Sequence, residues 1–226
     1  MVQGAVFYDK GVTCKLCEHE FSTKRIFSSH LRVDRRDSDL CTYYRNGLVP
    51  YYYEISVCPA CGFAFSDSFA SVSPVLRASV KAAYEPYRFA AGGDLSGARS
   101  ADDAILALEL ALRSGSCARE DSLYLAGICM RLAWLHRLGN DDERQVAFLA
   151  AANRYYLDVY SSGKDDANLP LVLHMLGETS MRTGAHAEAR RWFGLLFNKD
   201  YADYPYLEIA KDAWADYRRQ TDAANR

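Results

Sequence analysis

Four cysteines lie in two closely spaced pairs, and thiolates at this spacing can bind a metal ion. The pairs are Cys14-Lys-Leu-Cys17 and Cys58-Pro-Ala-Cys61. A Cys-x-x-Cys turn directs two thiolates toward one point, and two such turns brought together supply the four sulfur ligands of a tetrahedral zinc site. Such a site is closed and leaves no position for a substrate. The sequence therefore predicts one structural Zn²⁺ ion bound by Cys14, Cys17, Cys58 and Cys61.

A redox role for the two pairs is the alternative interpretation. One Cys-x-x-Cys motif would be enough for thiol–disulfide exchange, and neither pair lies in a thioredoxin-like β-α-β context. Pro59 and Gly62 also suit the turn of a metal-binding knuckle. The odd total of seven cysteines and their paired spacing favour metal over disulfides, and so a reducing, cytoplasmic environment.

The segment between the two pairs contains further ligand and nucleophile types. Its candidate functional residues are His30, Arg35, Arg36, Asp37, Asp39 and Cys41. They could bind a second metal ion, or Cys41 could act as a nucleophile beside a carboxylate and a histidine. Cys41 could also replace one of the four paired thiols. We favour a structural interpretation, in which Asp37 and Asp39 pair with Arg32, Arg35 or Arg36 and cap turns, and Cys41 is packed inside or is a spare thiol.

The same segment is rich in basic residues. Lys24, Arg25, Arg32, Arg35 and Arg36 precede several tyrosines, and such a surface can bind nucleic acid through phosphate contacts and base stacking. However, residues 1–70 contain eight Lys or Arg and eight Asp or Glu, and the net charge of the whole chain is −2. Because neutralising phosphates drives most such binding, a salt-bridged loop is the favoured prediction.

The composition changes near residue 70. Residues 1–70 contain five of the seven cysteines, and strands are expected over 2–13 and 51–57. We predict a zinc-ribbon-like module over 1–70 with an insertion over 18–57. A module of this size has a small core, so metal binding would supply much of its folding free energy.

From residue 71 to 226 the pattern is helical. Apolar residues recur every three or four positions, and turns rich in glycine and serine separate the segments. Helices are expected over about 73–87, 102–113, 125–136, 149–159, 169–183 and 186–198, with a last helix from near residue 205. The predicted fold class is therefore α+β, predominantly α.

One helix pair matches a repeat pattern. Gly177, Ala189 and Phe193 lie at the offsets of a tetratricopeptide repeat, where small residues let two helices approach and the aromatic ring fills the space beyond. Ser180 stands where the repeat usually has a tyrosine, and the preceding pair does not keep the 34-residue period. We predict an irregular, tetratricopeptide-like array of helical hairpins.

The run Arg36-Asp37-Ser38-Asp39-Leu40-Cys41 adds a family resemblance. With the Cys-x-x-Cys before it and the Cys-Pro-x-Cys-Gly after it, this run resembles the bacterial family called domain of unknown function 2225. The resemblance covers most of the chain. It implies a zinc-ribbon-like head on a tetratricopeptide-like helical tail, and it brings no established activity.

These patterns favour a non-enzymatic interaction or scaffold protein. Stacked helix pairs form a concave surface that suits a peptide or helix of a protein partner. A nucleic-acid-binding adaptor is the second hypothesis, and an enzyme that uses Asp37, Asp39 and Cys41 is the third. No apolar run is long enough to span a membrane, and no secretion signal is evident at the N-terminus, so we expect a cytoplasmic protein without membrane contact.

Overall fold

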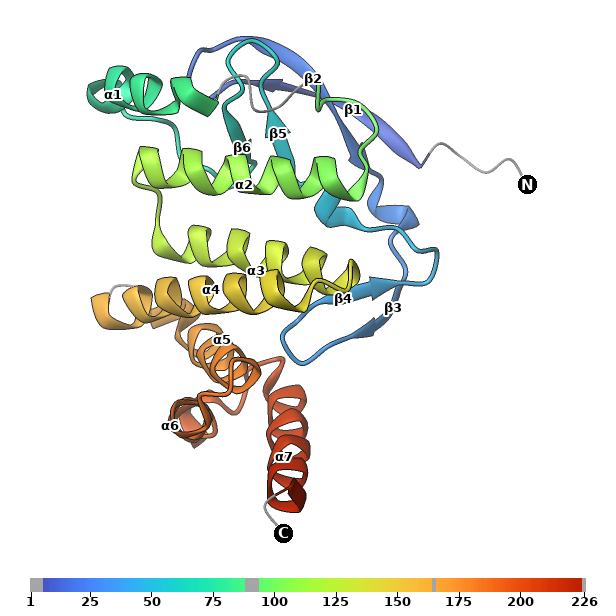
Figure 1. The fold of residues 1–226 in the computed structure, drawn as a ribbon, viewed down its shortest axis with the longest axis vertical. Helices are drawn as coiled ribbons and strands as arrows, with labels where there is room; N and C mark the ends of the chain where they lie inside the picture. Colours follow the sequence, from blue (N-terminus) through green and yellow to red (C-terminus); the bar gives the residue numbers. More distant parts are fainter. Residues whose placement is uncertain (1–5, 88–93, 164–165, 225–226) are drawn as a thin grey trace.

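Six short strands form three separate two-stranded antiparallel sheets at the N-terminal end of the chain (Figure 1). The computed structural model describes residues 6–87, 94–163 and 166–224. The sheets pair β1 (Phe7–Thr13) with β2 (Glu20–Ile26), β3 (Val33–Arg36) with β4 (Thr42–Tyr44), and β5 (Ile55–Val57) with β6 (Ala64–Ser66). We call these strands and their connections the head.

The two strands expected from sequence are only partly present. The first corresponds to β1, and residues 2–5 of that prediction lie outside the described residues. The second is shorter than predicted, because Pro50–Tyr53 form a 3₁₀ turn and the strand begins at Ile55. Pro50 stands in the first turn of this 3₁₀ segment, where its missing N–H costs no hydrogen bond. The four remaining strands lack a clear alternation of apolar residues, so periodicity did not indicate them.

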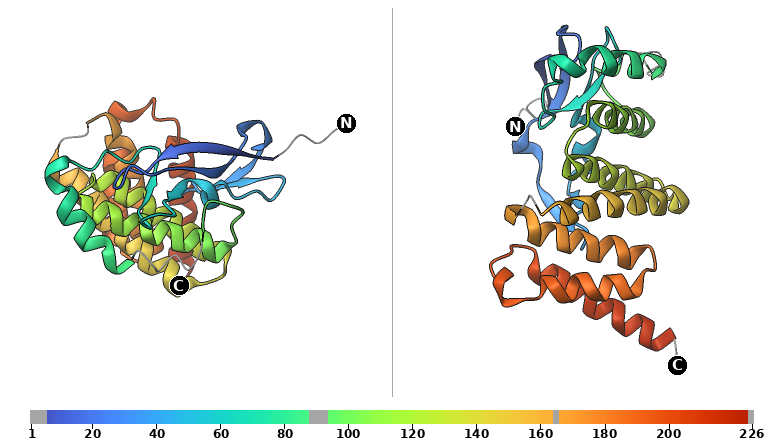
Figure 2. Two further views of the ribbon diagram at one scale, coloured as in Figure 1. Left: turned by 90° about the horizontal axis from the view of Figure 1, so that it is seen from above. Right: turned by 90° about the vertical axis from the view of Figure 1, so that its left-hand side faces the viewer.

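Seven α-helices follow the head in the described part of the chain. They are α1 (Pro74–Tyr84), α2 (Ala101–Ala118), α3 (Ser122–Leu138), α4 (Asp142–Ser162), α5 (Leu169–Arg182), α6 (His186–Leu196) and α7 (Leu207–Ala224). From α2 to α6 each helix packs against the next, and the succession of layers is visible in Figure 2. The protein is therefore α+β and predominantly α, as predicted.

Helix α2 extends past the expected stop at residues 114–116. The hydroxyl of Ser114 donates a hydrogen bond to the Leu110 carbonyl at 3.0 Å, a bond that a helix interior accommodates. Gly115 is a close-packing position, because a Cβ atom there would lie 2.8 Å from Leu125 Cδ2 on α3. The Ser114 hydroxyl also donates to the Ala64 carbonyl of β6, so the serine and the glycine serve the contacts of α2 with β6 and α3. Helix α2 ends at Ala118, and the backbone of Arg119 after it is left-handed.

The hydrophobic core continues from the head into the helices. The ring of Phe63, next to the second cysteine pair, contacts the ring of Tyr84 on α1 with centroids 5.2 Å apart. The Tyr84 hydroxyl donates to the Gly62 carbonyl at 3.0 Å. Helix α2 also packs on β5 and β6. The predicted boundary between residues 70 and 71 is thus crossed by continuous packing, and a division into two domains there stays a prediction.

The predicted repeat positions of α5 and α6 are in close contact. A Cβ atom on Gly177 would lie 2.7 Å from the Phe193 ring, so only glycine fits between the two helices at this distance. The Phe193 ring also contacts α7, where its centroid is 5.4 Å from that of Trp214. Ala189 is fully buried. No helix in the described segments is both long and apolar enough to span a membrane.

Candidate metal centre and the acidic loop

The two cysteine pairs occupy the turns of two hairpins that have the same local structure. In the β1–β2 turn, the Cys14 N–H donates to the His19 carbonyl at 2.9 Å; in the β5–β6 turn, the Cys58 N–H donates to the Phe63 carbonyl at 3.0 Å. The residue after each pair has left-handed backbone, with φ of 63° at Glu18 and 72° at Gly62. Each turn therefore presents its two thiols on one side.

The four sulfur atoms come together at one point. The Sγ atoms of Cys14 and Cys61 are 3.7 Å apart, those of Cys17 and Cys58 are 3.6 Å apart, and all four lie within 4.8 Å of one another. Four sulfur ligands at about 2.3 Å from a tetrahedral metal ion lie about 3.8 Å from each other. The thiol cluster, as we call Cys14, Cys17, Cys58 and Cys61, therefore has the dimensions to hold a metal ion.

The thiol cluster is partly shielded from solvent. Cys14 and Cys58 are buried, Cys61 is half-buried and Cys17 is exposed. Hydrogen bonds from Cys14 and Cys61 lower the pKa of the Cys58 thiol. Contacts among the same thiols raise the pKa of Cys14 and of Cys61, so without a metal ion the cluster favours a thiolate at Cys58 and protonated neighbours. A thiolate is the form that binds a metal ion, so binding of an ion would release the remaining protons.

The loop between β3 and β4 contains a fully buried carboxylate. Asp39 forms an ion pair with Arg137 from α3, lies 3.6 Å from Nε of Arg182 from α5, and accepts a hydrogen bond from Trp134 Nε1 at 3.2 Å. Burial alone would raise the pKa of Asp39, but the hydrogen bond from Arg137 and the charge of Arg182 outweigh it and lower the pKa. Asp39 is therefore an ionised carboxylate compensated within the chain.

The residues beside Asp39 have partners from the same helices. Asp37 accepts hydrogen bonds from the Tyr43 hydroxyl at 2.9 Å and from Arg137 at 3.1 Å. The Ser38 hydroxyl donates to Glu178 on α5 at 2.9 Å, and Arg182 donates to the Ser38 oxygen at 3.2 Å. In Figure 1 the β3–β4 hairpin extends away from the other strands and along the helices. We call residues 37–41 the acidic loop, and it attaches the head to α3 and α5.

The remaining candidates for a second site do not assemble around a ligand. Cys41 is 1 % exposed, and burial together with the charge of Asp39 raises its pKa to about 12. His30 is in a separate 3₁₀ turn, where it lines a surface hollow with Arg32 and Arg45. Throughout the described residues, the thiol cluster is the one group of three or more His, Cys, Asp or Glu ligands that converge.

Most of the basic stretch is in contact with the protein itself. Arg25 is buried and donates to the Ser56 hydroxyl at 2.9 Å. The guanidinium of Arg35 lies 3.5 Å from the centroid of the Tyr43 ring, and that of Arg36 lies 5.1 Å from the Tyr206 ring. These side chains therefore do not form one free basic patch.

Sequence reasoning missed the helical partners of the acidic loop. Ser38 and Asp39 are separated from Arg182 and Arg137 by 144 and 98 residues. The available signal was Glu178, a charged residue that follows the mainly apolar run 171–177 in a predicted helix. A carboxylate at such a position requires a partner, although the sequence does not say which one.

These features define a mainly helical protein with a small β-structured head that contains four convergent thiols. A model of one protein family matches residues 7–217, nearly the whole chain, and that family is described as an uncharacterized protein conserved in bacteria (DUF2225). The chain belongs to this family. No curated protein and no solved structure matches the chain.

Proposed function

We propose that this chain is a zinc-stabilised, non-enzymatic interaction protein that binds a protein or peptide partner. The observation that carries the proposal is the convergence of four thiols at distances that fit a tetrahedral ion. Four thiolates suit Zn²⁺ and complete its coordination. One structural Zn²⁺ held by Cys14, Cys17, Cys58 and Cys61 would fix the two hairpin turns to each other.

The burial and pairing of the acidic-loop residues support the non-enzymatic part of this proposal. A nucleophilic cysteine needs access to substrate and a thiolate near neutral pH, whereas Cys41 is 1 % exposed and has a raised pKa. Asp39 is equally inaccessible and is committed to Arg137 and Arg182. In the proposed function this loop is a structural link.

The stacked helices support partner binding. Successive pairs such as α3–α4 and α5–α6 build an extended, layered surface of the kind that tetratricopeptide-like proteins use to bind peptides. The contact between Gly177 and Phe193 is of the type that this repeat uses between its two helices. Nucleic-acid binding through the head has less support, because Arg25, Arg35 and Arg36 are occupied by intramolecular contacts.

The metal part of the proposal is tested by native mass spectrometry with elemental analysis on wild type and on Cys41→Ser. We expect one zinc per chain in both proteins. A second metal ion that is lost in Cys41→Ser would overturn the structural role of the acidic loop and favour an enzyme. A wild-type protein that purifies in a folded state without any metal would overturn the zinc assignment.

The interaction part is tested by affinity purification from a bacterium that encodes the chain. We expect a specific partner that is lost when exposed residues of the helix surface are changed in a protein that still folds. Failure to recover a specific partner, or recovery that is the same with every surface variant, would contradict the interaction proposal.

A further inference from the structure

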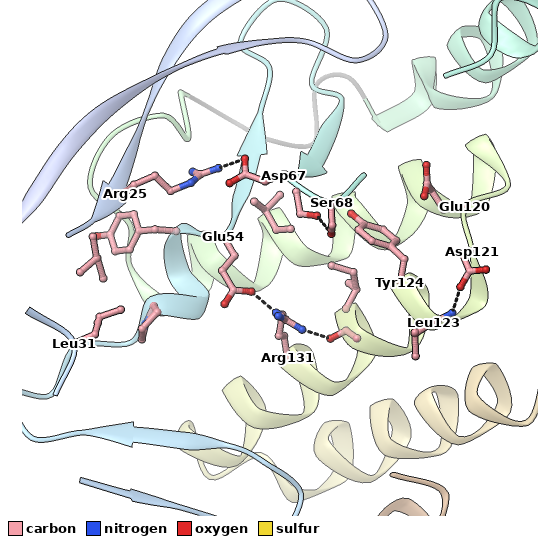
Figure 3. Close-up of a pocket in the computed structure, with 17 residues that line it drawn as sticks. Arg25, Leu31, Glu54, Asp67, Ser68, Glu120, Asp121, Leu123, Tyr124 and Arg131 are labelled. Atoms are coloured by element: carbon pink, nitrogen blue, oxygen red, sulfur yellow. Dashed lines mark hydrogen bonds and ion pairs between the residues drawn. The ribbon is translucent and has the colours of Figure 1, made fainter. Parts of the chain in front are cut away.

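The hollow beside the thiol cluster differs from the larger pocket of the head. The larger pocket, about 640 Å³, lies between the head and α3, and Figure 3 shows two of its charged residues, Arg131 and Glu54, joined in an ion pair. None of the described residues that line it is a cysteine. The smaller hollow, about 220 Å³, lies between the thiol cluster and α1, and Cys17 and Cys61 form part of its wall. Of the two, the smaller hollow therefore brings small molecules from solvent to a nucleophilic group.

This smaller hollow, which we call the thiol hollow, suits a small uncharged reactant. Its other walls are Leu16, Ala60, Lys81, Tyr84 and Glu85, so one basic and one acidic side chain offset each other. Four thiolates around a bound Zn²⁺ leave the cluster with a net negative charge, which disfavours an anionic reactant. Hydrogen peroxide is small and uncharged, and it is a common oxidant of thiolates.

The four thiols are unequally accessible to such a reactant. Cys14 and Cys58 are buried, Cys61 is half-buried and Cys17 is exposed. Oxidation of a cysteine requires the thiolate form and access for the oxidant. Because every cysteine bound to zinc is a thiolate, the four sulfurs of the loaded cluster differ in access. Cys17 is therefore the first sulfur that an oxidant in the thiol hollow meets.

A second sulfur lies where it can react with an oxidised Cys17. The Sγ atom of Cys58, on the other turn, is 3.6 Å from that of Cys17, and the two need to approach by about 1.5 Å to form a disulfide. The Cys14 sulfur accepts a hydrogen bond from the Leu16 N–H at 3.4 Å and lies 3.7 Å from the sulfur of Cys61. These contacts favour a bond between the two turns over a bond within one turn.

We propose that hydrogen peroxide enters the thiol hollow and oxidises Cys17 first, and that Cys58 then forms a disulfide with Cys17 and the bound ion is released. This inference rests on the proposed function, because it requires the thiol cluster to hold Zn²⁺. It adds to that function a modification site and a means of regulating the metal content of the head. The disulfide links the β1–β2 turn to the β5–β6 turn in place of the ion.

The reaction transfers two electrons from the protein to one molecule of hydrogen peroxide. The Cys17 thiolate attacks one oxygen, the O–O bond breaks, and the departing hydroxide takes a proton from solvent, which leaves a sulfenic acid on Cys17. The Cys58 thiolate attacks that sulfur, the S–S bond forms and the S–O bond breaks, and the second hydroxide also becomes water. Cys14 and Cys61 are then too few ligands to retain zinc. A dithiol reverses the disulfide by thiol–disulfide exchange.

The test treats the zinc-loaded, full-length protein with hydrogen peroxide. Zinc release is followed with a coloured chelator, and peptide mass spectrometry maps the disulfides after free thiols are blocked with N-ethylmaleimide. We expect zinc release in step with a first disulfide between Cys17 and Cys58, and renewed zinc binding after reduction with dithiothreitol. A first disulfide within one turn, Cys14–Cys17 or Cys58–Cys61, or zinc release without a disulfide, would overturn the inference.

Access through the thiol hollow is tested with a matched pair of α1 variants. Lys81→Trp places a ring in the wall of the hollow, whereas Ala82→Trp places the same ring at the next exposed position, which does not line it. Both variants should bind one zinc before treatment. We expect Lys81→Trp to release zinc about fivefold more slowly than wild type, since it restricts access to the thiolate, and Ala82→Trp to react at the wild-type rate. Equal rates for the two variants would contradict the proposed route.

The outcomes separate this inference from the proposed function. A protein that binds zinc and keeps it in hydrogen peroxide would overturn the inference and leave the proposed function standing, whereas a protein that binds no zinc would count against both. Removal of the ion by the chelator alone is the competing route. Release at the same rate with and without hydrogen peroxide would show that the site exchanges its metal freely, and it would overturn the peroxide assignment.

Discussion

The thiol cluster and the acidic loop have similar chemistry in the sequence and opposite arrangements in the fold. Both consist of closely spaced residues that can bind metal ions. In the thiol cluster, four side chains converge and their partners are one another. In the acidic loop, the carboxylate of Asp39 is surrounded by Arg137, Arg182 and Trp134.

The difference between these two sites shows which one could hold a metal ion. The chain provides two guanidinium groups for Asp39, so the negative charge of the loop is balanced internally. In the described residues, the side-chain partners of the four thiols are one another. A set of ligand-type residues therefore predicts a metal ion only where the rest of the chain does not fill the site first.

The largest expected effect comes from opening the thiol cluster. Cys58→Ser should abolish metal binding and lower the free energy of unfolding by at least several kcal/mol, because metal binding and folding of such a small head are coupled. The melting temperature should fall by more than about 10 °C. Thermal unfolding followed by circular dichroism, with zinc content measured on the same sample, checks this.

The matched control for this change is Cys117→Ser, which alters a half-buried cysteine outside the cluster. It should keep its metal and melt within a few degrees of wild type. If Cys58→Ser had the same melting temperature as Cys117→Ser, the head would be stabilised by its apolar core and not by the ion.

The next largest effect comes from removing a partner of the acidic loop. Arg137→Met leaves the fully buried Asp39 with a longer contact to Arg182, and we expect a loss of about 3 kcal/mol, since a buried charge without its partner is costly. Urea denaturation gives the value. Arg144→Met removes an exposed ion pair on the next helix, and it should change stability by less than about 0.5 kcal/mol. Equal effects would mean that the loop is not a structural link.

Acid should lower the free energy of unfolding through His174, a buried histidine near the acidic loop. Burial lowers the pKa of His174, which contacts the Tyr204 hydroxyl and lies next to the acidic loop, to about 4. In the unfolded chain the pKa of a histidine side chain is about 6.5. Below pH 6.5 the unfolded state binds a proton that the folded state does not, so the stability present above pH 6.5 is lost as the pH falls toward 4.

The variant His174→Gln separates this loss from metal release, which also occurs in acid. Between pH 7 and pH 4.5 the free energy of unfolding of wild type should fall by about 2–3 kcal/mol more than that of the variant. Denaturant titrations at both pH values provide the comparison. Parallel pH profiles for the two proteins would mean that His174 is protonated in the folded state.

The smallest expected effect is a difference in alkylation rate between two thiols outside the cluster, Cys41 and Cys117. Cys41 should not react with iodoacetamide in the native protein at pH 7.5, because it is buried and its pKa is raised. The half-buried Cys117 should react first, and peptide mass spectrometry of a time course resolves the two sites. Modification of Cys41 ahead of Cys117 would restore the enzyme hypothesis.

Local patterns predicted the parts of this structure that local forces determine. The spacing of Cys14, Cys17, Cys58 and Cys61 depends on two tight turns, and the helices after residue 71 have apolar residues on one face. The expected turns rich in glycine and serine are likewise where α3 and α4 end, at Gly139 and Gly163. Ser114 and Gly115 were misinterpreted as a helix end, because their role depends on β6 and α3 rather than on their neighbours in sequence.

The acidic loop could not be derived in the same way. Pairing of Asp37 and Asp39 with nearby arginines is the interpretation that the sequence favours, and Arg35 does pair with Asp37. The arginine that binds both carboxylates is Arg137, far along the chain. Strand β3 is exposed at every position, so no hydrophobic pattern indicates the hairpin that positions the loop. Contacts between such distant segments follow from the packing of the whole molecule, which one sequence does not reveal.

The long separation between the acidic loop and its partners has a consequence for synthesis on the ribosome. Chains grow at about 5–20 residues per second, so the 144 residues from Ser38 to Arg182 take roughly 7–30 s to make. The thiol cluster has all its ligands once Cys61 has emerged, long before α5 exists. If the cluster binds zinc as proposed, a nascent chain can hold the ion while the acidic loop is still exposed to water. Attachment of the loop to α5 then becomes one of the last steps of folding.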